Sequence, residues 1–166
     1  MNRSICYRKA AYQLCGFLFT LPQIAVGNNS AMLTVKVTVV ATPCVINDNQ
    51  AITVEFKNLV ASRVDGNNYR MPVEYTLDCK DAASSAVKLQ VLGTPAEFDS
   101  RLLQTSNPSA LGIQLLNGAT KFPVNSWLNF TYPNKPELWA VPVKADGVTL
   151  SPGEFAATAT MKVEYQ

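Results

Sequence analysis

Cysteine is the residue type in this sequence whose number and placement point to covalent chemistry. The 166-residue chain contains four cysteines and no histidine. Cys6 and Cys15 lie in an N-terminal segment that we expect to be removed, so Cys44 and Cys79 remain in the mature protein. Two cysteines in an exported domain are expected to form a disulfide. Closing the loop between Cys44 and Cys79 stabilises the folded protein by roughly 4 kcal/mol on the chain-entropy model. The alternative is a pair of buried free thiols.

Patterns for other catalytic chemistry are missing from the sequence. It has no histidine to act as a base, no G-x-S-x-G nucleophile motif and no phosphate-binding loop. Its Asp and Glu residues are scattered, and two cysteines alone are too few ligands for a metal site. We therefore expect a protein that is not an enzyme and that uses no metal or cofactor.

The two tryptophans, Trp127 and Trp139, leave one further chemistry open, which is stacking on a sugar ring. Such a platform needs an exposed aromatic face beside polar groups. We expect both tryptophans in the core or along a groove instead. A small secreted carbohydrate-binding module is kept as an alternative function.

The N-terminus has the pattern of an export signal. Basic residues precede an apolar stretch over residues 10–21, and Ala25 and Gly27 supply small side chains at the spacing that a signal peptidase accepts. The apolar stretch is shorter than the ~20 residues of a membrane-spanning helix. We predict a signal peptide over residues 1–27, with cleavage after Gly27. An uncleaved anchor is the alternative.

Removal of the signal changes the net charge. The full sequence has 14 Lys and Arg against 12 Asp and Glu. Three of the basic residues, Arg3, Arg8 and Lys9, lie in the signal, so the mature chain carries one more negative charge than positive. A nearly neutral chain has no strong attraction for nucleic acid or an anionic membrane surface. We therefore expect no nucleic-acid partner.

The mature sequence is typical of an all-β domain, because short apolar or alternating runs are separated by turn residues. We predict strands at Val45-Ile46, Ile52–Phe56, Pro72–Cys79, Val87–Leu92, Leu111–Leu116, Leu138–Val143 and Phe155–Tyr165. Ala96–Leu103 is the best candidate for a short helical or irregular turn. Many short strands with one disulfide favour an immunoglobulin-like sandwich over a barrel.

The last of these segments alternates with the period of two that marks a half-buried strand. Its apolar face carries Phe155, Ala157, Ala159, Met161, Val163 and Tyr165. If Pro72–Cys79 is strand B of the sandwich, the final segment is strand F, and the sequence ends at Gln166 without a strand G. We expect this to leave the core open along a groove bordered by unpaired backbone groups.

A second alternating segment follows the predicted signal. Its apolar face holds Ala31, Leu33, Val35, Val37 and Val39. This segment is either the first strand of the domain itself, filling the groove in cis, or a strand that fills the groove of another molecule. We divide the mature chain into an N-terminal extension, residues 28–40, and a domain, residues 41–166.

Three blocks of this sequence resemble the pilin subunits of chaperone–usher pili of Gram-negative bacteria, particularly the minor tip and adaptor subunits of type 1 and P pili. The blocks are residues 38–47 (TVVATPCVIN), 111–117 (LGIQLLN) and 152–160 (PGEFAATAT). The ending Val163-Glu164-Tyr165-Gln166, with tyrosine next to last, fits the same pattern. The blocks are spread over the whole mature chain, and their order is more specific than any one of them.

The resemblance implies an incomplete immunoglobulin-like sandwich that lacks its last strand and is completed by donor-strand exchange. A periplasmic pilus chaperone lends a strand during folding, and at the outer-membrane usher the extension of the next subunit replaces it. In this sequence the donor strand would be Ala31–Val39, and the acceptor groove and chaperone contact would be Phe155–Tyr165 with Gln166. Basic residues of the chaperone would bind the carboxylate of Gln166. Val37 departs from the family, since many pilins have glycine at that place.

From the resemblance we expect a structural subunit of a surface fimbria, exported through the periplasm to the cell surface. We favour a minor tip or adaptor subunit, whose neighbours are other pilus subunits and a tip adhesin. The major rod subunit is the alternative within the family.

Overall fold

The computed structural model describes residue 36, residues 43–80 and residues 84–166. Apart from Lys36, these residues belong to one compact unit, Val39–Gln166. The predicted signal, residues 1–27, lies outside the described residues. So do the side chains predicted for the donor strand, namely Ala31, Leu33, Val35, Val37 and Val39.

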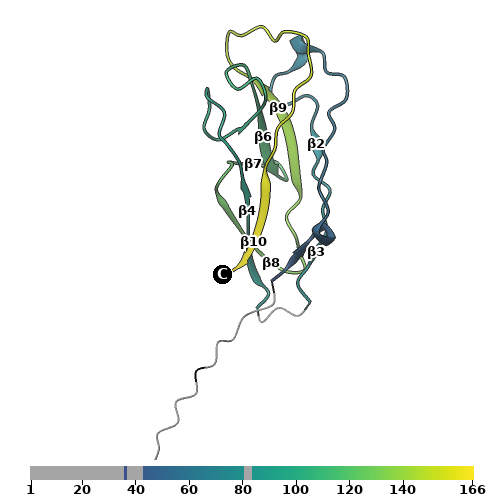
Figure 1. The fold of residues 1–166 in the computed structure, drawn as a ribbon, viewed down its shortest axis with the longest axis vertical. Helices are drawn as coiled ribbons and strands as arrows, with labels where there is room; N and C mark the ends of the chain where they lie inside the picture. The colour runs from purple at the N-terminus through teal and green to yellow at the C-terminus, as the bar shows by residue number, and fades with distance from the viewer. Residues whose placement is uncertain (1–35, 37–42, 81–83) are drawn as a thin grey trace, which may run out of the picture. The chain divides into compact units, whose positions relative to one another are not determined.

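The described part of the chain is almost entirely β-structure (Figure 1). Its helical elements are two short 3-10 turns, η1 (Asn47–Asn49) and η2 (Ala61–Arg63). The strands are β1 (Val45–Ile46), β2 (Met71–Pro72), β3 (Leu77–Asp78), β4 (Ala86–Leu92), β5 (Leu103–Gln104), β6 (Leu111–Asn117), β7 (Thr120–Phe122), β8 (Trp127–Thr131), β9 (Leu138–Lys144) and β10 (Thr160–Tyr165). The predicted all-β class is confirmed.

The strands form two sheets and a short ribbon. One sheet has the order β10-β4-β8, the other has the order β2-β9-β6-β5 with β7 added to β6, and the ribbon is β1-β3. The core cluster takes Leu89 and Val91 from β4, Ile113 and Leu115 from β6, and Leu138 from β9. Two antiparallel sheets that bury such a cluster between them make an immunoglobulin-like sandwich.

Alternation along β4 explains how this strand separates core from solvent. Val87 and Leu89 are both 0 % exposed and Val91 is buried, whereas Lys88 and Gln90, which alternate with them, are half-buried on the outer face. A strand whose residues alternate in this way must place one face against the opposite sheet.

β6 is buried on both faces from Leu111 to Leu115. The loop before β5 covers its outer side, and a Cβ added at Gly112 would lie only 3.0 Å from Cβ of Leu102. The backbone amide of Ala96 donates a hydrogen bond across the same loop to the carbonyl oxygen of Leu102, at 2.9 Å. The residues before Leu103 thus form an irregular turn and no helix, and Gly112 allows that turn to approach β6 closely.

Three predicted strands differ from the observed ones. Ile52–Phe56 is extended but pairs with no strand in the described chain. Pro72–Cys79 is interrupted, because β2 pairs with β9 while β3 pairs with β1. The C-terminal strand begins at Thr160 rather than Phe155, because its partner β4 ends at Leu92, which lies opposite Thr160. Strands β5, β7 and β8 were not predicted.

Candidate functional site: an open apolar groove

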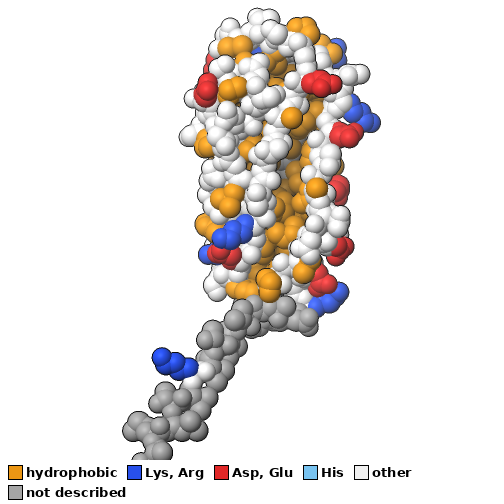
Figure 2. All heavy atoms as spheres, viewed as in Figure 1, with side chains coloured by type: hydrophobic (Ala, Val, Ile, Leu, Met, Phe, Trp, Pro, Cys, Tyr) orange, Lys and Arg blue, Asp and Glu red, His pale blue; other side chains and the backbone are white. Residues whose placement is uncertain are grey.

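A groove separates two extended segments, residues 51–57 and residues 155–161. Figure 2 shows hydrophobic side chains exposed along it. Its cavity has a volume of about 810 Å³. The groove floor is made of core residues from both sheets, and these are Val91, Leu103, Ile113, Leu115, Leu138 and Ala140. The groove therefore reaches the hydrophobic core between its two walls, although each floor residue is itself only 3–7 % exposed.

The wall on one side of the groove comes from the segment that was predicted as a strand, Ile52–Phe56. Its exposure alternates, with Ile52, Val54 and Phe56 half-buried against the core and the residues between them exposed. The sequence predicted a strand over Ile52–Phe56 but did not assign its side chains to the groove. The sequence signal for that role was the alternation of apolar Ile52, Val54 and Phe56 with the residues between them.

The opposite wall holds four of the residues predicted for the acceptor groove, namely Phe155, Ala157, Ala159 and Met161. Phe155 and Met161 are half-buried, but Ala157 and Ala159 are exposed. Small side chains on a face that no described element covers stay in contact with solvent. The remaining predicted residues do not line this cavity. Val163 packs on the core, and Tyr165 and Gln166 lie at the end of β10.

Each edge of the groove has backbone groups without a partner in the described chain, although Ala156 is hydrogen-bonded to Ser106 through both its carbonyl and its amide. No backbone–backbone hydrogen bond joins residues 52–57 to another described segment. On the other edge, β10 pairs with β4 alone, which leaves its outer side without a described partner strand. Extended edges of this kind are templates for an added strand.

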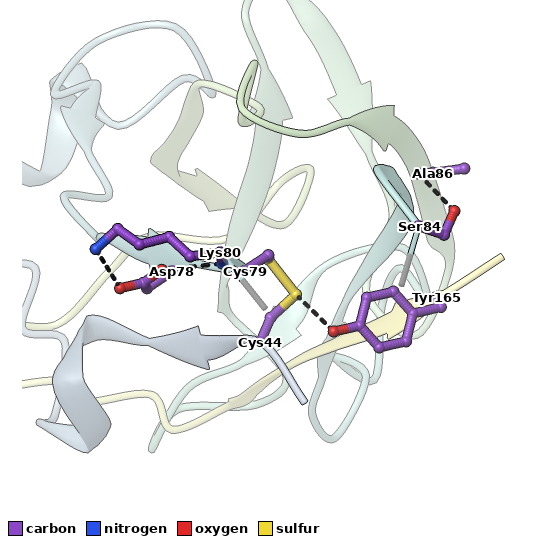
Figure 3. The surroundings of a disulfide bond; sticks show 7 residues. All are labelled: Cys44, Asp78, Cys79, Lys80, Ser84, Ala86 and Tyr165. Atoms are coloured by element: carbon purple, nitrogen blue, oxygen red, sulfur yellow. Dashed lines mark hydrogen bonds and ion pairs between the residues drawn. A yellow bond between two sulfur atoms is a disulfide. The ribbon is translucent and has the colours of Figure 1, made fainter. Parts of the chain in front are cut away.

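The predicted disulfide is present at one end of the groove, which we call its base (Figure 3). Cys44 and Cys79 lie with their Cα atoms 4.4 Å apart, and Cys44 also lines the cavity. Beside Cys79, Lys80 Nζ lies 2.8 Å from an Asp78 carboxylate oxygen, and this pairing lowers the pKa of Asp78. Both side chains are well exposed, so the ion pair adds little to stability. The covalent bond is what fixes this end of the wall.

Gln166 is bound to β4 and not directed into the cavity. Its backbone amide donates to the carbonyl of Ala86 at 3.0 Å, and its side-chain nitrogen donates to the carbonyl of Val87 at 2.6 Å. These bonds extend the pairing of β10 with β4 by one residue. The position of Gln166 thus fixes the end of β10 at the base of the groove.

A second cavity, of about 750 Å³, continues the groove at the opposite end. Both cavities are lined by Val54, Phe56 and Phe155. The rings of Phe56 and Phe155 approach each other there, with 6.0 Å between ring centroids and an interplanar angle of 33°. They are the only aromatic ring pair among the residues that the structure describes. The contact between Phe56 and Phe155 therefore lies where the two cavities adjoin.

Neither tryptophan lies in the groove. Trp127 is 39 % exposed on β8, so its predicted place in the core or groove is wrong. The Nζ atom of Lys88 lies 4.4 Å from the centroid of the Trp127 ring, and the Arg70 guanidinium lies 4.2 Å from that of Trp139. A cation therefore lies over one face of each indole.

Within residues 43–80 and 84–166, no cluster of three or more potential ligand side chains is arranged to hold a metal ion. The same residues include no helix of the length and hydropathy that crossing a bilayer requires.

Comparison with known proteins gives relatives over most of the chain. A 128-residue stretch is 41 % identical to the "Uncharacterized fimbrial-like protein YfcR" of Escherichia coli K12 and covers 75 % of this chain and 74 % of that protein. A second E. coli K12 protein, "Uncharacterized fimbrial-like protein YfcQ", is 36 % identical over 129 residues, covering 74 % of this chain and 79 % of the relative.

The fold is also similar to solved pilus structures. The P pilus rod subunit PapA matches with a TM-score of 0.60 at 22 % identity, over 82 % of this chain and 100 % of PapA. The P pilus adaptor subunit PapF matches with a TM-score of 0.56 at 25 % identity, over 78 % of this chain and 100 % of PapF. A subunit in the structure of a chaperone–usher pilus matches with a TM-score of 0.57 at 21 % identity, over 89 % and 99 % of the two chains.

The family comparison covers the groove and both of its walls. The model of the family described as "Fimbrial protein" matches residues 33–166, which include every described strand. Together with the two E. coli relatives, this match establishes that the chain belongs to the fimbrial protein family.

Proposed function

We propose that this protein is a structural subunit of a chaperone–usher fimbria that accepts a β-strand in its groove and donates Ala31–Val39 to a neighbouring subunit. The open groove over the core is the observation that carries the proposal. Both of its edges have free backbone groups, and its floor is apolar. A strand added there would satisfy the backbone groups and also bury the half-exposed apolar side chains of the two walls.

The direction of the two edges supports this mode of binding. The segment 51–57 runs from the base of the groove toward its far end, and β10 runs back toward the base (Figure 1). An inserted strand would therefore be parallel to one edge and antiparallel to the other. It would convert two separate edges into one continuous sheet, with a spacing of about 4.8 Å between neighbouring strands.

The proposed binding partners follow from this addition of a strand to the groove. A periplasmic chaperone covers the groove during folding, since an open apolar groove otherwise favours aggregation. At the outer-membrane usher the extension of another subunit takes the place of the chaperone strand, and the assembled fibre is exposed at the cell surface. The structural similarity to the P pilus subunits PapA and PapF supports neighbours of the same fold.

Within the fimbria we favour a minor adaptor position behind a tip adhesin over the major rod position. The adaptor PapF and the rod subunit PapA have the same fold, so their similarity to this chain leaves both positions open. The resemblance of residues 38–47, 111–117 and 152–160 to minor tip and adaptor subunits favours the adaptor position.

The proposal is tested by supplying a strand to the mature chain, residues 28–166. The chain is unfolded in denaturant and refolded by dilution, with or without a synthetic peptide of residues 28–42. We expect the peptide to raise the melting temperature and to suppress aggregation. A matched peptide with Leu33→Asp and Val35→Asp is expected to have no effect. Equal melting of the chain with both peptides and with none would contradict strand acceptance.

A further inference from the structure

Two large hydrophobic side chains are exposed at opposite ends of the groove. Val45 lies at the base, directly after Cys44, and is 36 % exposed. Val60 lies at the far end, opposite the disulfide, because it precedes η2 and Ala61 of that turn lines the second cavity. It is 52 % exposed, more than any other exposed large hydrophobic residue of the described chain. Figure 1 shows η2 and β3, the partner of β1, at opposite ends of the domain.

The backbone holds both valines in place. The amide of Val60 donates to the hydroxyl of Tyr69 at 2.9 Å, and its carbonyl accepts from the amide of Arg63 at 2.8 Å. Val45 pairs with Asp78 between β1 and β3, beside the disulfide. A valine on a fixed backbone has one stiff side-chain torsion, so it loses little conformational entropy when a partner covers it. Both positions are therefore suited to contact another molecule.

The short link between the donor strand and its domain determines what reaches these ends. In the proposed exchange Ala31–Val39 lies in the groove of a neighbour, whereas Cys44 is fixed in the body of the donor by its disulfide. The stretch from Val39 to Cys44 spans at most about 18 Å. This is less than the ~30 Å diameter of a small domain. The base of the donor is therefore held close to the end of the groove at which its strand leaves.

A fibre requires that this end is the far end. β10 runs toward the base, so a strand inserted antiparallel to it leaves the groove at the far end (Figure 1). The base of the donor then sits on the far end of the acceptor, and this head-to-tail contact can repeat along an open fibre. Insertion in the opposite direction would bring two bases together. It would leave no room at the base for a further subunit and would produce a closed pair.

Charges of opposite sign lie beside the two valines. Arg63 follows Val60 by one turn, is exposed and forms no ion pair within the described residues. Asp48 in η1, directly after β1, is likewise exposed and without an ion pair there. The carboxylate of Asp65, near Arg63, instead accepts hydrogen bonds from two amides of its own turn. Opposite charges that face each other across a contact favour one orientation of the partners.

We infer that the far end of this domain docks the base of the subunit that fills its groove, with Val60 and Arg63 facing Val45 and Asp48. Both surfaces are present on this chain, so the partner that fits is a second copy of it. The inference rests on the proposed strand exchange and adds to it a contact between the folded bodies. A minor position held by a short run of copies would contain such junctions.

The inference is tested with a pair of mature chains, residues 28–166. The acceptor carries Leu33→Asp and Val35→Asp, which prevent it from donating, and the groove of the donor is filled beforehand with the peptide of residues 28–42. Fluorescence measures the rate at which a labelled donor leaves the acceptor, and the labelled peptide alone is measured in the same way. We expect the donor to leave about threefold to tenfold more slowly than the peptide, which is the range for covering two partly exposed valines.

Variants of the two valines locate the contact. Val60→Thr in the acceptor should raise the dissociation rate of the donor about threefold to tenfold. It should leave the rate of the peptide unchanged, because the peptide has no base. Val45→Thr in the donor should have the same effect, and the two changes together should add little, since they remove one shared contact. Leu92→Thr is the matched control, because Leu92 is equally exposed but lies on β4, outside both surfaces.

The charged residues are tested in the same pair. Arg63→Gln in the acceptor and Asp48→Asn in the donor should each raise the dissociation rate of the donor about twofold, and their combination should raise it no further. Donor rates that do not respond to Val60→Thr and Val45→Thr, or that respond no more than those of the peptide, would overturn the inference. Failure of donor and peptide alike to enter the acceptor would contradict strand acceptance itself, and the junction with it.

Discussion

The hydroxyl of Tyr165 lies 3.8 Å from Sγ of Cys44, with the hydroxyl as the hydrogen-bond donor (Figure 3). Tyr165 is the last residue of β10, which borders one side of the groove, and Cys44 precedes β1 on the other side. The two walls therefore meet at the disulfide. This contact closes the groove at its base, while the rest of the groove stays open.

The first prediction concerns this closed base. Replacing Cys44 and Cys79 together by serine should lower the free energy of unfolding by about 4 kcal/mol, because the loop is no longer constrained in the unfolded chain. The matched variant Tyr165→Phe keeps the disulfide and should cost about 1 kcal/mol or less. Guanidinium unfolding of both variants measures the difference. Similar losses in the two variants would show that the disulfide is not the main constraint.

The second prediction concerns donation of the extension. Leu33→Asp places a charge at an inward position and should stop subunits from joining, because a carboxylate in an apolar groove has no partner. The matched variant Lys36→Asp changes an outward position and should leave joining intact. Ladders of joined subunits on gels of unheated samples measure the effect. Chaperone binding should be normal in both variants, and joining by Leu33→Asp at the normal rate would exclude Ala31–Val39 as the donor.

Alternation in the sequence predicted which side chains face the core better than it predicted which segments pair. The strand predicted at Val87–Leu92 is observed as β4, which has a neighbouring strand on each side and buries Val87, Leu89 and Val91. Ile52, Val54 and Phe56 alternate just as clearly, but no described strand lies beside them, so no hydrogen-bonded strand forms. Pairing depends on a distant partner, and the period of two carries no information about that partner.

Other features could not be read from local sequence at all. The contact between Phe56 and Phe155 depends on the distance between two walls that are far apart in the chain. β8 was not predicted, although Leu128 and Phe130 alternate with exposed residues and pack on the core as a strand requires. Tertiary packing sets both features.

The third prediction concerns Tyr75 in the core. It is 4 % exposed, and its hydroxyl donates to the carbonyl of Pro136 at 2.8 Å. Burial raises the pKa of Tyr75 above its ordinary value, so the hydroxyl keeps its proton. Tyr75→Phe should lower the free energy of unfolding by about 1–3 kcal/mol, because the carbonyl loses its partner.

Tyr132→Phe is the matched control for Tyr75→Phe. Tyr132 is half-buried outside the core cluster, and its change should be nearly neutral. Denaturant unfolding compares the two. Equal stability of the two variants would show that the hydroxyl of Tyr75 contributes nothing.

The fourth prediction concerns Asp99 in the turn before β5. Hydrogen bonds from the Arg101 side chain, and then from its backbone amide, lower the pKa of Asp99 from 3.8 to about 2. A lowered pKa in the folded state gives stability that is present above the unfolded value and is lost as the pH falls through the folded value. Asp99→Asn should therefore cost stability near neutral pH, and the difference from the natural protein should shrink between about pH 4 and pH 2.

The expected cost of Asp99→Asn is small, since the Arg101 partner is well exposed. Melting temperatures of the two proteins across that pH range measure it. Asp146→Asn is the control, because Asp146 forms no ion pair in the described chain. A difference that persists unchanged at the lowest pH would contradict the assigned cause.

Amide hydrogen exchange tests strand acceptance most directly, because it reports hydrogen bonding at each edge of the groove. The mature chain is compared with and without a bound donor peptide. We predict new protection of the amides that face the groove from its two walls, residues 52–57 and residues 157–165, while those of β10 that bond to β4 and those of β6 in the centre of its sheet stay equally protected in both samples. Protection of the two walls that is the same with and without the peptide would contradict the central claim that this domain completes its sheet with a strand from another molecule.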